Sequence, residues 1–148
     1  MSLPTTILVA TDFSPPAEHA LDYAIELANK LGAKVHLVNV IGIPTYGVPE
    51  LGLAISSSVM DSVVKSSQSE LDKLVAARAP TKIEAMLRTG DARDVIINTA
   101  VEVGAQLIVM GTHGRRGVSR ALLGSVAESV VRHAPCPVLI VRADKHGK

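Results

Sequence analysis

Short apolar segments rich in β-branched residues alternate with longer amphipathic segments, and this alternation is the strongest constraint on how the chain can fold. The segments Thr6 to Thr11 and Leu107 to Met110 are apolar almost throughout. Continuous apolar runs are typical of parallel strands buried on both faces, because half-exposed strands alternate apolar and polar residues. Strands separated by helices need crossover connections, so the pattern predicts an α/β fold with a parallel sheet covered by helices on both faces.

The alternation divides the chain into five strand segments and four helical segments. Ser14 and Asp91 are expected to cap the starts of the first and third helices, and Gly32 and Gly104 to end them. The third strand alternates in polarity, so we expect it near an edge of the sheet. The predicted strands cover 6–11, 34–41, 82–88, 107–110 and 138–141, and the predicted helices cover about 15–31, 59–79, 92–103 and 125–133.

The segment 42–58 places Gly and Pro among mostly small or apolar side chains. It is too broken for regular structure and too long for a simple connection, which predicts a mobile flap. No repeat, low-complexity tract or linker interrupts the remainder, so we expect one domain over residues 1–148.

Five parallel strands joined by right-handed crossovers cover both faces of the sheet if the chain reverses direction along the sheet once. The doubly wound strand order 3-2-1-4-5 places this reversal between the first and fourth strands. Ligands of such sheets bind in the crevice at the carboxyl ends of the strands on either side of the reversal. The sequence therefore predicts a site lined by Ala10 to Ser14 and by the residues from Met110 onward.

Unusual residues follow both strands at this expected crevice. Asp12 follows the first strand, and Gly111-Thr112-His113-Gly114-Arg115-Arg116-Gly117 follows the fourth. Glycines let main-chain amides turn toward an anion without an obstructing Cβ, and the arginines add positive charge. Ser125, followed three residues later by Glu128, is typical of a capping box. It predicts a helix that begins at Ser125 with its positive end facing the same crevice.

Composition excludes several classes of function. Fifteen Lys and Arg against 14 Asp and Glu give a formal net charge of +1, which provides no global attraction to nucleic acid or anionic membranes. No apolar run approaches the roughly 20 residues of a membrane span, and no signal peptide is evident, so we expect a cytoplasmic protein. The single cysteine, Cys136, lacks accompanying ligands at metal-site spacing and is expected to act as a small hydrophobic residue.

These residues resemble the universal stress protein family over essentially the whole chain. ATP-binding members of that family carry a glycine pattern that is here Gly111-x2-Gly114-x9-Gly124-Ser125. The opening segment Ile7 to Ser14 and the closing segment Cys136 to Val141 are also similar to recurring segments of the family. The resemblance implies ATP as the ligand, with or without Mg²⁺ or Mn²⁺.

The resemblance also implies roles for individual residues. Asp12 would hold the ribose hydroxyls, and we expect its side chain to be free for this because Ser14 is better placed to cap the helix. Val40 and the main chain around Ala10 would contact adenine, with Met110 packing near the base. Main-chain amides would surround the phosphates; they belong to Gly111, Thr112, His113, Gly114, Arg115, Arg116, Gly117, Gly124, Ser125 and Val126.

Members of the family pair through their last strand, which implies a homodimer here. Val138, Leu139, Ile140 and Val141 carry no charge or proline that would discourage another strand from pairing with this edge. The alternative is a short edge strand protected by Pro137 and the chain's tail.

Taken with the residues, the resemblance implies an ATP-binding stress-response or signalling module with at most slow ATP hydrolysis. One alternative is a dimeric interaction module that binds AMP, cAMP or no nucleotide. Another is an ATP-cleaving enzyme, but the sequence shows no Walker A pattern. Histidine can act as a catalytic base near neutral pH, but His113 stands in a glycine loop, where we expect it to pack or donate one hydrogen bond. We therefore assign no catalytic residue.

Overall fold

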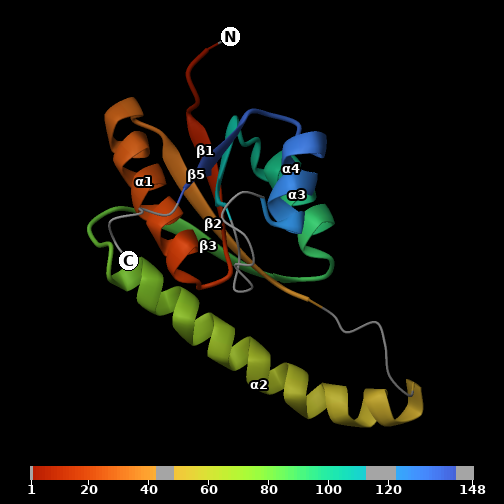
Figure 1. The fold of residues 1–148 in the computed structure, drawn as a ribbon. Helices are drawn as coiled ribbons and strands as arrows, with labels where there is room; N and C mark the ends of the chain where they lie inside the picture. The colour runs from red at the N-terminus through yellow and green to blue at the C-terminus, as the bar shows by residue number, and fades with distance from the viewer. Residues whose placement is uncertain (1, 43–48, 113–122, 143–148) are drawn as a thin grey trace.

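The computed structural model describes residues 2–42, 49–112 and 123–142, the side chains of 49–57 excepted. Five strands form one parallel sheet in the order β3-β2-β1-β4-β5, as the sequence predicted (Figure 1). The strands are β1 (Thr6–Thr11), β2 (Lys34–Ile41), β3 (Ile83–Thr89), β4 (Leu107–Gly111) and β5 (Val138–Val141). Three of them have the predicted bounds, and β3 and β4 differ by one residue at their ends.

The four helices are α1 (Pro15–Leu31), α2 (Pro49–Ala76), α3 (Ala92–Val103) and α4 (Ser125–His133). Ser14 caps α1 by accepting from the Ala17 amide, and Asp91 caps α3 by accepting from two amides of its first turn. Gly32 and Gly104 end these helices in the left-handed conformation, with φ of 69° and 68°. The capping residues predicted for α1 and α3 are therefore confirmed.

Helices cover both faces of the sheet. Figure 1 shows α1 on one side and α3 with α4 on the other. The apolar core is correspondingly divided into two clusters, because successive strand residues point to opposite faces. The first cluster joins Ile7 and Val9 to α1 and to the end of α2, and the second joins Leu8 to α3 and α4.

The prediction of an irregular flap at 42–58 is wrong from Pro49 onward, where α2 begins ten residues before the expected start at Val59. Proline is tolerated at the first position of a helix because its missing amide would have no partner there. The residues that follow it, including Leu51 and Ala54, are good helix formers that offset one interior glycine. The prediction for residues 43–48 lies outside the described residues.

The capping box predicted for α4 is also wrong, although the helix has the predicted bounds. Gly124 is the N-cap residue and makes no side-chain capping hydrogen bond, while Ser125 is the first helical residue. Glu128 does not reach back: its carboxylate accepts from Arg132 at 3.0 Å, one turn further along the helix. The i,i+4 ion pair thus uses the side chain that a capping box requires.

The long helix α2 packs on the sheet through its last turns. Leu71 and Leu74 are 0% and 8% exposed, whereas Val59 and Val63, further from the sheet, are 52% and 38% exposed. Figure 1 shows the yellow beginning of α2 extending away from the strands. Among the helices in the described part of the chain, none is long and apolar enough to cross a membrane.

We predict that Leu71→Ala lowers the free energy of unfolding by about 2–5 kcal/mol, because it opens a cavity in the first cluster. Val63→Ala, in the same helix, should change it by about 0.5 kcal/mol or less, because that side chain is already partly in water. Urea denaturation of both variants followed by circular dichroism measures the difference. Equal losses would show that the two halves of α2 are packed alike.

Candidate functional site

The predicted reversal lies between β1 and β4, which are neighbours at the centre of the sheet. Their register pairs Val9 with Val109, so the two carboxyl ends lie side by side. The chain leaving β1 enters α1 on one face, and α4, which follows β4 in the chain, lies on the other face. Ligands of open α/β sheets bind at such a switch point, so the residues around it form the candidate site.

The turn after β1 is held by a chain of short hydrogen bonds. The Phe13 amide donates to Thr11 Oγ1 at 3.0 Å, and the Ser14 amide donates to Asp12 Oδ1 at 3.0 Å. Phe13 itself has a φ of 66°, a conformation that is uncommon for a bulky residue. The expectation that Ser14 leaves the Asp12 side chain free is wrong, since Asp12 fixes the Ser14 amide while Ser14 caps the helix.

The end of β4 lies against the first turn of α1. A Cβ added to Gly111 would stand 3.0 Å from the Pro16 carbonyl oxygen and 3.4 Å from the Ala17 nitrogen. Because these are main-chain atoms of a helix, they cannot move aside cheaply. Packing therefore requires the first glycine of the Gly-rich pattern, independently of any contact with a ligand.

The start of α4 is tied to the same place. The Gly124 amide donates to the Thr112 carbonyl at 2.8 Å, which brings the two ends of the intervening loop together. The amides of Ser125 and Val126 belong to the first turn of α4, where they have no partner within the helix. The cap residue Gly124 has no side chain to satisfy these amides, and the Gly124 to Thr112 bond places the partial positive charge of the helix start near the end of β4.

The four apolar residues predicted for the site meet in the second core cluster. Met110 is a buried member of that cluster at 7% exposed, and Ala10, Val40 and Val126 pack against it while remaining partly exposed. They come from four different elements, since Ala10 lies in β1, Val40 in β2, Met110 in β4 and Val126 in α4. The fold therefore places a half-covered apolar surface on the α3 and α4 face of the sheet.

Thr112 is half-buried directly after β4. The predicted site residues that lie outside the described residues are His113, Gly114, Arg115, Arg116 and Gly117. Within the described ranges, no three His, Cys, Asp or Glu side chains are grouped so that they could hold a metal ion.

Two further polar arrangements border this region, and the sequence analysis named neither. Asn39, 5% exposed, donates from Nδ2 to the Thr11 carbonyl at 2.8 Å. Arg88, opposite Val40 in the register, forms a two-pronged ion pair with Glu102 of α3, both distances being 2.7 Å. The sequence did carry a signal for the Asn39 arrangement, because asparagine is depleted in strands. Nothing in the sequence indicates which carboxylate Arg88 meets.

The Arg88 and Glu102 pair perturbs both groups. The hydrogen bonds from Arg88 lower the pKa of the Glu102 carboxyl, and the same bonds raise the pKa of the Arg88 guanidinium. Glu102 is exposed and Arg88 is half-buried, which favours a structural link between β3 and α3 over a proton-transfer role. Burial raises the pKa of the Cys136 thiol, which packs against the second cluster as a small hydrophobic residue.

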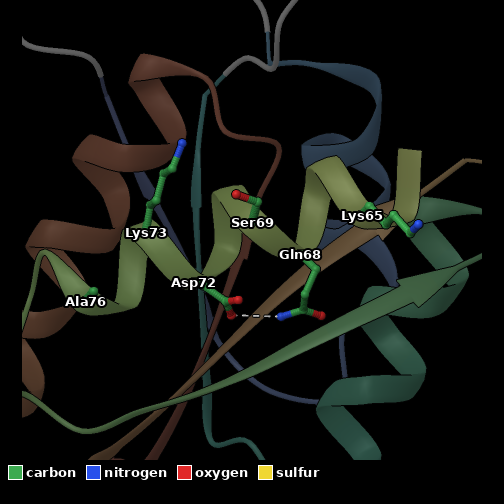
Figure 2. A pocket seen from close by; sticks show the side chains of 6 residues that line it. All are labelled: Lys65, Gln68, Ser69, Asp72, Lys73 and Ala76. Atoms are coloured by element: carbon green, nitrogen blue, oxygen red, sulfur yellow. Dashed lines mark hydrogen bonds between the residues drawn. The ribbon is translucent and has the colours of Figure 1, made fainter. Parts of the chain in front are cut away.

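A hollow of about 520 Å³ lies elsewhere, on the surface of α2. Figure 2 shows its six side chains, all from this one helix, with Gln68 donating to Asp72 at 2.9 Å. Its lysines, Lys65 and Lys73, are exposed, and Lys73 lies 3.8 Å from Glu70. This surface lacks the converging buried polar groups of a ligand site.

The strand order β3-β2-β1-β4-β5 makes this an open α/β sheet of the class that binds ligands at its switch point. The sequence profile of the universal stress protein family matches residues 4–142. The chain therefore belongs to the universal stress protein family.

Individual relatives agree with this family assignment. A Staphylococcus haemolyticus protein that carries the universal stress protein name is 39% identical over 145 residues, covering 94% of this chain and 85% of that protein. The structure of a universal stress protein from Lactobacillus plantarum aligns with a TM-score of 0.80 at 25% identity, covering 96% of this chain and 100% of that one. A universal stress protein from Archaeoglobus fulgidus, in complex with dAMP, aligns with a TM-score of 0.67 at 25% identity, covering 95% and 98%.

We predict that Gly111→Ala lowers the free energy of unfolding by about 1–3 kcal/mol, since its Cβ would press on the main chain of α1. Gly42→Ala is the matched control, because nothing lies within 4 Å of the Cβ position there. The measurement is the urea midpoint of each variant. If both midpoints equal that of the wild type, β4 and α1 do not pack as closely as described.

Proposed function

We propose that this chain binds ATP at the switch point between β1 and β4. The observation that carries the proposal is the attachment of the start of α4 to the end of β4 through Gly124 and Thr112, with a cap residue that has no side chain. The first main-chain amides of a helix attract anions, and phosphates in particular. In this chain the start of α4 lies at the carboxyl ends of the strands, where ligands of such sheets bind, and within the family's Gly-rich pattern.

The base and ribose have matching groups nearby. The half-covered apolar surface of Ala10, Val40, Met110 and Val126 fits the flat, weakly polar adenine ring. Asp12, at the end of β1, supplies carboxylate oxygens that accept hydrogen bonds from ribose hydroxyls. Its Oδ1 already accepts from Ser14, which fixes the direction of the carboxylate before any ligand arrives.

In this proposal, main-chain groups bind the phosphates. The amides of Gly111 to Gly117, with those of Ser125 and Val126, surround them in this proposal, and Arg115 and Arg116 add positive charge. The Gly124 amide has its own partner in Thr112, so its part is to hold the start of α4 in place. An accompanying Mg²⁺ or Mn²⁺ would neutralise phosphate charge, with the phosphate oxygens as its main ligands.

We further propose that the protein is a cytoplasmic homodimer that acts as a nucleotide-dependent stress-response module, with at most slow ATP hydrolysis. The two edges of the sheet differ in a way that supports pairing through β5. Edge strand β3 carries Glu84 and Arg88, charges that oppose pairing with another strand, whereas β5 carries none.

A second candidate ligand is a nucleotide with one phosphate, such as AMP or cAMP. The dAMP complex of the Archaeoglobus fulgidus protein favours it, since that structure covers nearly all of this chain. The apolar surface would serve such a ligand equally well, whereas Asp12 would meet both ribose hydroxyls of AMP but only the 2′-hydroxyl of cAMP. The number of phosphates is therefore decided by the loop after β4.

The first test is to purify the protein without added nucleotide, denature it and identify the released ligand by chromatography and mass spectrometry. We expect ATP from the wild type. We expect at least about tenfold less from Gly114→Val, because the added side chain covers main-chain amides that bind phosphate. Val131→Ala, an exposed change on α4, is the control that should retain the ligand.

The outcomes separate the candidates. Equal ATP from the wild type and Gly114→Val would remove the glycine loop from the mechanism. Release of AMP or cAMP would favour the second candidate, and purified protein that neither carries nor takes up an adenine nucleotide would overturn both.

The homodimer has a test of its own. Sedimentation velocity of the wild type should give twice the chain mass of 15.5 kDa. Ile140→Lys, which puts a charge on the β5 edge, should weaken association by at least about tenfold, while Ala85→Lys on the β3 edge should leave it unchanged. Circular dichroism checks that both variants are folded. A folded Ile140→Lys dimer would contradict pairing through β5.

A further inference from the structure

Asn39 is a buried polar residue of β2. Its neighbours in β2, Val38 and Val40, are apolar, yet Asn39 is 5% exposed. Asparagine is depleted in strands, and a buried amide is tolerated where its polar atoms find partners. Asn39 Nδ2 donates to the Thr11 carbonyl oxygen at 2.8 Å, so this side chain links β2 to β1 outside the regular ladder.

This hydrogen bond lies where the pairing of β1 with β2 ends. Thr11 and Asn39 are the last paired residues of β1 and β2, whereas β2 continues beside β3 for two more residues. The hydrogen bond therefore lies at the point where β1 leaves the sheet. It holds the residue immediately before Asp12.

The other side of Asp12 is held as well. Phe13 has a φ of 66°, and such a conformation in a bulky residue persists where its surroundings impose it. Its amide donates to Thr11 Oγ1, and its side chain packs against the first core cluster. Thr11 thus receives two hydrogen bonds, one from the Asn39 side chain and one from Phe13. Both constrain the main chain that carries the Asp12 carboxylate.

We propose that Asn39 is a positioning residue for Asp12: by holding the Thr11 carbonyl, it directs the Asp12 carboxylate toward the ribose hydroxyls of the bound nucleotide. This inference rests on the proposed function, since it requires a nucleotide at the switch point. Leucine at this position has a similar size but cannot donate to Thr11. The turn would then be held on one side only: the Ser14 amide would still bind Asp12 Oδ1, but the Thr11 main chain could shift and move the carboxylate relative to the ribose.

The test compares ATP with 2′,3′-dideoxyATP, which lacks both ribose hydroxyls. Dissociation constants are measured by titration calorimetry for the wild-type chain, Asn39→Leu and the control Thr99→Val. Thr99 is a fully buried polar residue of α3, away from this turn. Melting curves verify that each protein is folded, and Asn39→Ser replaces Asn39→Leu if the latter does not fold.

We expect the wild type to prefer ATP over the dideoxy analogue, and Asn39→Leu to lose roughly tenfold in ATP affinity, the size of one lost hydrogen bond. The affinity of Asn39→Leu for the dideoxy analogue should stay nearly constant, so its preference for ATP over the analogue is lost. A residue with a merely structural role would weaken both ligands alike. In an Asp12→Ala background, Asn39→Leu should have no further effect on the preference.

Three results would overturn the proposal, and each identifies a different step that fails. If Asn39→Leu keeps the wild-type preference, the positioning role fails and ATP binding stands. If the wild type binds both ligands equally, the role of Asp12 at the ribose fails too. If the wild type binds neither ligand, the proposed function itself fails.

Discussion

Burial of β1 on both faces is the constraint on which the rest of the structure depends. Ile7, Leu8 and Val9 are all 0% exposed, and they belong alternately to the two core clusters. A strand that is apolar on both faces must be covered on both, so helices have to pass on each side of it. With right-handed crossovers this requires the chain to reverse along the sheet, and the reversal creates the switch point beside β1.

The sequence predicted the parts of the fold in which local chemistry and burial agree. Strand order, the caps of α1 and α3, and the edge position of β3 all follow from patterns within short windows. The start of α2 could not be predicted in this way, because Gly and Pro are strong breakers on average and tolerable at particular positions. The cap of α4 failed for a related reason: Glu128 has two partners within reach, and the sequence does not show that Arg132 is the one used.

At the site, the sequence identified residues but not the contacts among them. It named Ala10, Val40, Met110 and Val126, and the fold brings these four into one cluster. It missed Asn39, and it assigned Gly111 to ligand binding without seeing the first turn of α1 against it. Such close approaches depend on how far apart two elements pack, which is a property of the whole core rather than of any short segment.

The packing of Gly111 and the electrostatics of the switch point have a common cause. Because β4 ends against the first turn of α1 and Gly124 returns to Thr112, two helix starts lie at the end of one strand. Each helix start carries partial positive charge; the side chain of the cap residue Ser14 satisfies an amide at α1, whereas the cap residue of α4, Gly124, has no side chain that could do so. Because Gly124 contributes no side chain at the start of α4, its own cap residue does not cover the main-chain amides there, and the same contacts that close the core bring this helix start to the end of β4. In the proposed ATP complex, affinity for the phosphates would depend on this backbone arrangement and on the glycines that permit it, while the side chains around β1 and β2 would decide which molecule carries the phosphates.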